Sequence, residues 1–240
     1  IAGTAGLAPG GTVSITTTSD SDWAPPQLAD PAADGFLKAA PPPDCAVSVH
    51  TPDHKSIVVT FKSGNLPTGY AIDSVLGDRS GGALGLRAQT FYEPRRYFHC
   101  EVDPTGSGKH GAARSAVLQI AGGDADSLSA IAPSDIEVGS PFALLLKAED
   151  RWGNPAEQYR GTVTVSAPGL ILPDGNDLKF GEDDAGVRRI DDAVFTEAGA
   201  TRIDLEDAAN GLTASSNQIQ IARELPALKL YWGDPHSGQI

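Results

Sequence analysis

The chain has 240 residues, among them 27 glycines and 18 prolines. Both residue types break helices, so their number argues against a helical bundle and favours many short strands joined by turns. The 18 basic and 31 acidic side chains give a net charge of -13. This balance excludes a general nucleic-acid-binding protein, because phosphate contacts need a basic surface. No apolar run reaches the roughly 18 residues of a membrane-spanning helix.

Strands are expected in both halves of the chain, because apolar and polar residues alternate there with a period of two. Turn signals recur between these segments, as is typical of an immunoglobulin-like sandwich. The predicted fold is therefore all-β, with tandem immunoglobulin-like β-sandwich domains. Strands are predicted at residues 12–18, 46–50, 56–61, 97–102 and 116–120 in the first half, and at 142–148, 161–166, 193–195, 201–205 and 218–221 in the second.

A domain boundary is indicated near the middle of the chain, where the charge changes. Residues 1–120 carry 9 basic and 11 acidic side chains, whereas residues 121–240 carry 9 basic and 20 acidic ones. Turn-forming residues between 121 and 134 separate the two sets of strands. We expect one β-sandwich-like domain at 1–125, with a long loop rich in proline and alanine, and a second domain at 126–225.

The two cysteines, Cys45 and Cys100, both lie in the first half. One pair of cysteines makes neither a disulfide framework nor a metal site. A single disulfide and two buried free thiols both remain open, and free thiols are the simpler interpretation.

Residues 103–110 (DPTGSGKH) partly match a phosphate-binding loop. Such a loop needs a glycine where this chain has Asp103, and serine or threonine where it has His110 after Lys109. The flanking segments also read as strands on both sides. A glycine-rich β-turn is the favoured interpretation.

Two further groups of residues suggest binding chemistry. Arg95 and Arg96 lie among aromatic residues at 91–99 (FYEPRRYFH) and could hold an anion or stack on a ring. We favour instead a pair of strands with aromatic core residues and a solvated turn. The acidic residues between 174 and 192 could collect Ca²⁺, but no EF-hand spacing is present. A solvated acidic surface is the favoured interpretation there.

The end of the chain has the most specific pattern. A predicted strand at 229–232 leads into Asp234, Pro235 and His236. An Asp-x-His at a strand end places a carboxylate and an imidazole on one side of the backbone. Metal-dependent hydrolases often carry ligands at the carboxyl ends of strands. The alternative is a polar tail that follows the last sandwich strand.

Residues 231–236 (YWGDPH) resemble the segment that opens the catalytic domain in a large bacterial family. That family is related to the PHP (polymerase and histidinol phosphatase) metal-dependent hydrolases. The resemblance covers nearly the whole chain, but it involves only the family's non-catalytic part and the catalytic opening. Residues 21–27, 102–108, 148–155 and 214–219 are similar to motifs of that family's N-terminal β-rich region.

The resemblance implies a parent protein that hydrolyses a phosphoester or related ester with Mn²⁺, Zn²⁺ or Fe²⁺. His236 matches its first metal ligand, and Asp234 matches an acidic residue that is a ligand or a neighbour of one. Gly238 stands where the family has a second histidine, which leaves that ligand missing or replaced. The chain starts at Ile1 and contains no methionine. We therefore expect a processed product or a fragment, in which 226–240 form the opening strand of a hydrolase domain.

The expected function is that of a non-catalytic accessory region whose partner is the downstream catalytic domain. Trp23 and Trp232 are the residues expected to approach that domain. This chain alone is expected to be inactive and to supply too few ligands to bind a metal ion fully. The alternative is a stand-alone secreted immunoglobulin-like module for binding or adhesion. By analogy, a periplasmic or secreted location is expected.

Overall fold

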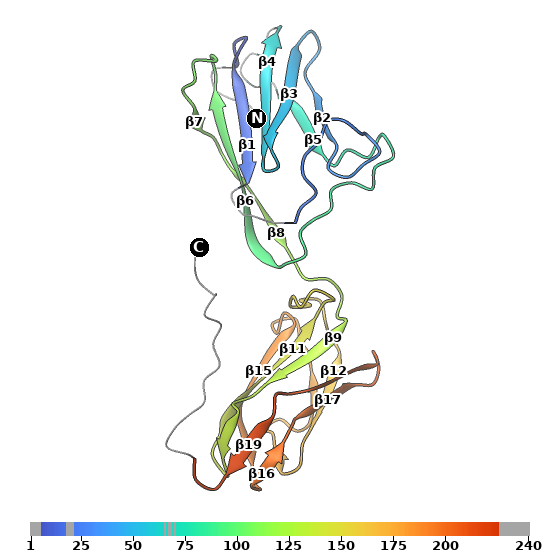
Figure 1. The fold of residues 1–240 in the computed structure, drawn as a ribbon, viewed down its shortest axis with the longest axis vertical. Helices are drawn as coiled ribbons and strands as arrows, with labels where there is room; N and C mark the ends of the chain where they lie inside the picture. The colour runs from blue at the N-terminus through green and yellow to red at the C-terminus, as the bar shows by residue number, and fades with distance from the viewer. Residues whose placement is uncertain (1–5, 18–21, 65, 67–68, 70, 226–240) are drawn as a thin grey trace. The chain divides into compact units, whose positions relative to one another are not determined.

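The computed structural model describes residues 6–17, 22–64, 66, 69 and 71–225. The chain divides into two compact units, Ile1–Ile120 and Ala121–Ile240, and each is described by itself. Within the described ranges all regular secondary structure is β (Figure 1). This confirms the predicted fold class, all-β with tandem immunoglobulin-like β-sandwich units. The division falls between Ile120 and Ala121, slightly before the expected boundary at residue 125.

Unit 1 is built on a six-stranded sheet in the order β3-β4-β1-β6-β7, with β8 also paired to β6. All pairings within this sheet are antiparallel. A separate two-stranded sheet is formed by β2 and β5. The strands are β1 (Thr12–Thr17), β2 (Leu37–Ala40), β3 (Ala46–Asp53), β4 (Ser56–Ser63), β5 (Asp73–Leu76), β6 (Glu93–Asp103), β7 (Gly111–Ala112) and β8 (Ala116–Ile120).

The core of unit 1 lies between these two sheets. Leu37 of β2 packs with Ile57 and Val59 of β4, and all three side chains are buried. Ile15 of β1 and Leu76 of β5 pack against this cluster and are only partly buried. The small sheet therefore covers part of the inner face of the large one, and other segments must cover the rest.

Unit 2 contains two four-stranded sheets, β14-β12-β17-β18 and β13-β15-β11-β9. A third sheet, β10-β19-β16, contains the parallel pair β10 and β19. The strands are β9 (Ser127–Ile131), β10 (Asp135–Glu137), β11 (Phe142–Glu149), β12 (Thr162–Ser166), β13 (Leu170–Ile171), β14 (Asp177–Lys179), β15 (Val187–Phe195), β16 (Gly199–Thr201), β17 (Asp204–Asp207), β18 (Leu212–Ser215) and β19 (Ile219–Ala222).

The core of unit 2 is larger and follows the alternation of its strands. Leu144 and Leu146 of β11 are fully buried, as are Val163 and Val165 of β12. In β12 these residues alternate with exposed ones, because successive side chains of a strand point to opposite faces. A stacked pair of aromatic rings from β11 and β15 closes the core, with the centroids of Phe142 and Phe195 5.4 Å apart.

Each strand predicted between residues 12 and 221 overlaps a strand of the structure, and the one at 201–205 is divided between β16 and β17. The strand predicted at 229–232 lies outside the described residues, and several short strands were not expected. The predicted long loop at 23–40 is partly wrong, because its last residues form β2 and a bridge joins Gln27 to Phe36. Cys45 and Cys100 are not joined by a disulfide in the structure. Cys100 is buried on β6, and burial raises the pKa of its thiol.

Candidate functional site

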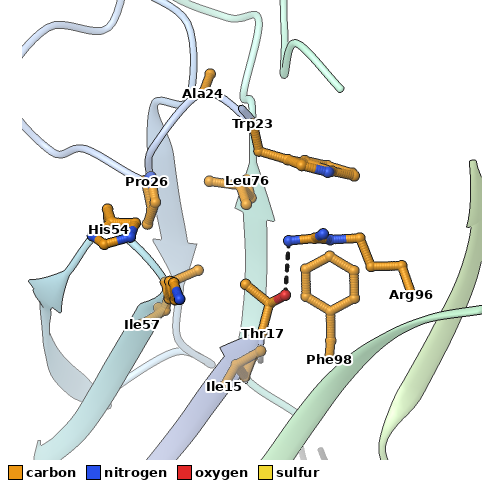
Figure 2. Close-up of a pocket in the computed structure, with 11 residues that line it drawn as sticks. Ile15, Thr17, Trp23, Ala24, Pro26, His54, Ile57, Leu76, Arg96 and Phe98 are labelled. Carbon is orange, nitrogen blue, oxygen red and sulfur yellow. Dashed lines mark hydrogen bonds between the residues drawn. The ribbon is translucent and has the colours of Figure 1, made fainter. Parts of the chain in front are cut away.

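The most unusual side chain in unit 1 is Arg96, which is 1% exposed on β6. Residues two apart in a strand share a face, so Arg96 lies on the same inner face as Phe98 and Cys100. Its guanidinium carbon lies 5.0 Å from the ring centroid of Trp23 and 5.9 Å from that of Phe98 (Figure 2). The rings of Trp23 and Phe98 meet edge to face at 6.0 Å. These contacts place a permanent cation between two aromatic rings.

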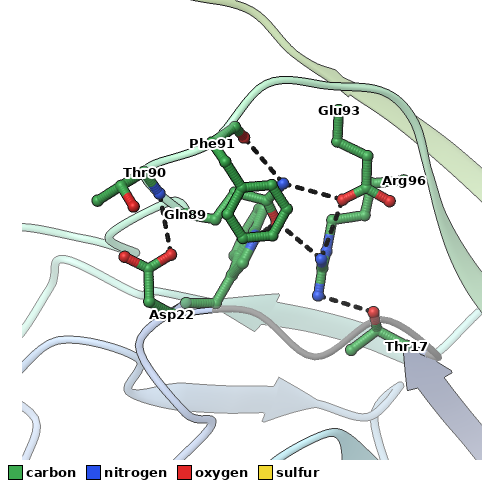
Figure 3. A network of polar contacts seen from close by, with 8 residues as sticks. Thr17, Asp22, Gln89, Thr90, Phe91, Glu93 and Arg96 are labelled. Atoms are coloured by element: carbon green, nitrogen blue, oxygen red, sulfur yellow. Dashed lines mark hydrogen bonds and ion pairs between the residues drawn. The ribbon is translucent and has the colours of Figure 1, made fainter. Parts of the chain in front are cut away.

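Hydrogen bonds fix the guanidinium of Arg96 (Figure 3). Its Nη1 donates to Oε1 of Gln89 at 2.7 Å and to Oε2 of Glu93 at 3.2 Å. Its Nη2 donates to Oγ1 of Thr17 at 2.8 Å. The contact with Glu93 is also an ion pair, and the Glu93 side chain is 20% exposed. Arg96 thus ties the end of β1 to β6.

Gln89 connects this cation to the loop that carries Trp23. Its Oε1 also accepts a hydrogen bond from Nε1 of Trp23 at 2.6 Å. Its Nε2 donates to Oε2 of Glu93 at 2.9 Å and to the carbonyl of Phe91 at 3.0 Å. Gln89 is 6% exposed, so its amide is used almost entirely within the protein. We call Thr17, Trp23, Gln89, Glu93 and Arg96 the Arg96 network.

A small cavity of about 50 Å³ lies beside the Arg96 network. Ile15, Ile57 and Leu76 supply apolar walls, and His54 lies on the side away from Arg96 (Figure 2). Lys55 also lines the cavity. A pocket for an organic ligand usually measures about 300–1,000 Å³. This cavity has room for a few water molecules at most. Its geometry therefore fits a packing space in the fold better than a substrate pocket.

In unit 2 the buried Asp150 holds the turn between β11 and β12. Its carboxylate accepts hydrogen bonds from the backbone N–H groups of Gly123 at 3.0 Å, Trp152 at 2.8 Å and Asn154 at 2.9 Å. The Asn154 amide donates to it as well. Burial acts to raise the pKa of Asp150, but these hydrogen bonds outweigh it and lower the pKa to about 2. The carboxylate is thus a charged anchor for a loop.

A second buried carboxylate, Asp207 at the end of β17, receives the hydroxyl of Tyr159 at 2.5 Å. Asn210 donates to it through its side chain at 2.6 Å, and the N–H of Ala209 donates at 3.1 Å. Burial acts to raise the pKa of Asp207, but these hydrogen bonds outweigh it and lower the pKa. Burial, followed by the hydrogen bond to Asp207, raises the pKa of Tyr159. The pair joins the segment before β12 to the β17–β18 turn.

Replacing Tyr159 with phenylalanine is expected to lower the free energy of unfolding of unit 2 by about 2 kcal/mol, because a hydrogen bond to a buried charge is lost. The ring should stay in place, since it packs edge to face on Phe180 at 5.0 Å. Hydrogen exchange of β12 and β17 measures the loss. Tyr97→Phe is the control, because Tyr97 is 41% exposed. An unchanged exchange rate in Tyr159→Phe would contradict the structural role.

Residues 103–110 form a turn around the buried Asp103. Its carboxylate accepts the N–H of Gly108 at 2.6 Å and that of Thr105 at 3.2 Å, together with the Ser107 hydroxyl at 3.3 Å. Burial acts to raise the pKa of Asp103, and the hydrogen bonds led by Gly108 outweigh it, so the pKa falls. The interpretation as a glycine-rich turn is confirmed.

The acidic residues of unit 2 near 183–192 lie in local contacts. Asp184 accepts the N–H of Gly181 at 2.7 Å, and Asp191 pairs with Arg189 at 2.9 Å on the surface. Over the described part of the chain, no three or more His, Cys, Asp or Glu side chains gather where they could hold a metal ion. These acidic residues serve loop geometry and surface charge.

The residues predicted from the sequence to form a site are not brought together by the described structure. Asp234, His236 and Trp232 lie outside the described residues. Trp23 is half-buried in the Arg96 network, and its approach to another domain stays a prediction. Sequence reasoning missed Thr17, which meets Arg96 from a distant part of the chain, and Gln89, which is only seven positions before Arg96. The alternation of Arg96 with Phe98 and Cys100 did not single it out, because Arg95 alternates with Tyr97 and His99 in the same way.

The sequence matches no protein-family model and no curated protein. Among solved structures, it is similar to a glycosyl hydrolase family 2 member from Bacteroides cellulosilyticus, with 11% identity and a TM-score of 0.37 over 88% of this chain and 28% of that chain. It is also similar to FdeC, an Escherichia coli adhesin, with 16% identity and a TM-score of 0.32 over 78% of this chain and 54% of that chain.

The adhesin InvE of Yersinia pseudotuberculosis is similar with 9% identity and a TM-score of 0.30, over 91% of this chain and 55% of that chain. The chain thus spans about half or less of the length of these three proteins. Within the described residues, no helix is long and apolar enough to cross a membrane.

Proposed function

We propose that the chain is a non-catalytic accessory β-sandwich region of a larger PHP-like metal-dependent hydrolase. Its partner is a downstream catalytic domain that acts on a phosphoester or a related ester. The observation that carries this proposal is that the buried ionisable groups hold the fold in place. Arg96, Asp103, Asp150 and Asp207 each hold a different loop or strand end through hydrogen bonds.

Active sites gather their ionisable groups in one cleft and shift their pKa values towards the pH of the reaction. The pKa of Asp150 shifts away from that range, because groups that also fix its position lower it to about 2. Its hydrogen-bonding capacity is spent on the turn, so little remains for a substrate or a metal ion. A scaffold that presents or shields a neighbouring active site needs this kind of rigidity.

The metal chemistry of the parent protein is part of this proposal. Asp234 and His236 would serve as ligands for Mn²⁺, Zn²⁺ or Fe²⁺, and a bound metal lowers the pKa of a water molecule to make a nucleophile. A catalytic zinc site takes about three protein ligands. The remaining ligands would come from the catalytic domain, which Trp23 and Trp232 would approach. A periplasmic or secreted location fits the proposal.

We expect this chain, with added Mn²⁺ or Zn²⁺, to hydrolyse p-nitrophenyl phosphate and p-nitrophenyl acetate no faster than the metal alone. The physical reason is the incomplete ligand set that Asp234 and His236 can supply. A spectrophotometric assay of p-nitrophenol release measures this. Turnover above the metal-only rate that His236→Ala abolishes would show that the chain is itself the enzyme, and the accessory role would then be wrong.

A second candidate function is a stand-alone secreted module for binding or adhesion. The exposed Trp152 favours it, because the residue is 55% exposed and the Arg151 guanidinium lies 4.5 Å from the centroid of its ring. Asp150 holds the turn that presents both side chains, and tryptophan and arginine are common anchors of interfaces. In this case, Trp152→Ala would abolish binding of the chain to a glycan array or to cells. Under the accessory role the wild-type chain itself would bind neither the glycan array nor cells.

A further inference from the structure

The strand β8 (Ala116–Ile120) is an open edge of the large sheet in unit 1. It pairs with β6 on one side, through Tyr97 opposite Val117 and Phe98 opposite Ala116, and no other strand pairs with it among the described residues (Figure 1). Val117 is 49% exposed and Leu118 is 48% exposed. Consecutive residues point to opposite faces, so both faces of β8 present apolar side chains to solvent.

The opposite edge of the same sheet is protected. That edge is β3 (Ala46–Asp53), which contains Pro52 and ends in a charged residue. Its pairing with β4 is interrupted by register shifts at both ends. Proline, charge and bulges are the usual means by which an edge strand is kept from pairing with other chains. β8 has neither charge nor proline, and its sequence AVLQI is typical of a strand that accepts a partner.

We propose that β8 pairs in antiparallel fashion with β8 of a second copy of this chain, around a twofold axis at Leu118. Full overlap of the five-residue strand requires this register. It places Ala116 opposite Ile120 of the partner subunit and Leu118 opposite Leu118 of the partner subunit. Because β8 has no charged side chain, no like charges face each other between the two strands, and the two large sheets join through one continuous set of strands.

The distribution of charge opposes a second copy less at this edge than it would in unit 2. Residues 1–120 carry 9 basic and 11 acidic side chains, whereas residues 121–240 carry 9 and 20. Two copies therefore repel each other less when they meet through residues 1–120 than when they meet through residues 121–240. Because the β3 edge is obstructed, pairing of two β8 strands closes the assembly as a symmetric dimer and gives no open chain of subunits.

Sedimentation equilibrium of the whole chain tests this pairing. The wild-type chain of 24.8 kDa is expected to show a concentration-dependent mass that approaches twice this value. Leu118→Lys and Leu118→Glu each place like charges opposite each other at the axis and should weaken dimerisation on the order of 100-fold. An equal mixture of the two variants should restore the dimer, because the axis then holds a lysine opposite a glutamate.

Val75→Lys is the matched control, because Val75 is 50% exposed on β5 and should leave the dimer intact. Restoration by the mixture also excludes misfolding of the single variants as the cause of their monomeric state. The proposal is overturned if the wild-type chain stays monomeric up to its solubility limit. It is equally overturned if Val75→Lys dissociates the dimer as Leu118→Lys does, or if the mixture stays monomeric.

Discussion

Replacing Arg96 with methionine is expected to destabilise unit 1 by about 3 kcal/mol, because buried hydrogen-bond acceptors lose a charged donor. Methionine keeps most of the length of the side chain between the rings of Trp23 and Phe98. The change therefore removes mainly the hydrogen bonds to Gln89, Glu93 and Thr17. Hydrogen exchange measured by mass spectrometry should show faster exchange in β1 and β6, while β11 and β12 of unit 2 stay unchanged.

Arg95→Met is the matched control for this experiment. Arg95 neighbours Arg96 on β6 but is exposed, so its replacement should change the free energy of unfolding by less than about 0.5 kcal/mol. Arg96→Lys should also destabilise unit 1, because an ammonium lacks the planar fork that reaches three acceptors at once. If Arg96→Met and Arg95→Met gave equal exchange in β6, the Arg96 network would have no structural role.

The strands that were predicted best are those in which the local pattern of apolar and polar residues already indicates a strand. In β12 the sequence TVTVS alternates polar and apolar residues, so the period of two was visible before any partner strand was known, and the burial of the strand follows it. The short strands β2 and β5 carry no such pattern. Their sequences LKAA and DSVL become strands because each pairs with the other across a long separation, which a single sequence does not show.

The contacts of the buried Arg96 were harder to predict, since some of them depend on groups that are distant in the chain. Arg96 and Thr17 meet because β1 lies beside β6, and Trp23 reaches Gln89 from another loop. Asp103 differs, because its hydrogen-bond donors follow within five residues. Local turn chemistry was therefore correctly predicted at 103–110, whereas the two arginines at 95 and 96 looked alike until the strand placed one of them inside.

Replacing Asp150 with asparagine is expected to destabilise unit 2 by about 2–3 kcal/mol at neutral pH, because an amide oxygen cannot accept all the hydrogen bonds that the carboxylate receives. The loss should depend on pH. The pKa of Asp150 falls from 3.8 to about 2 in the folded protein. A group whose pKa is lower in the folded than in the unfolded protein stabilises the fold at pH values above its unfolded pKa. This stabilisation is lost as the pH falls through the folded pKa. About 2 kcal/mol should therefore disappear between pH 4 and pH 2.

Hydrogen exchange of β11 at neutral pH and thermal unfolding across the acid range measure this difference between wild type and Asp150→Asn. The stability gap should be constant from pH 7 to about pH 5 and should narrow towards pH 2, because wild-type Asp150 becomes protonated there. Asp174→Asn is the control, since Asp174 is exposed on a loop of the same unit and removes the same charge. A gap that stayed constant down to pH 2, or an equal effect of Asp174→Asn, would show that the charge of Asp150 does not hold the turn.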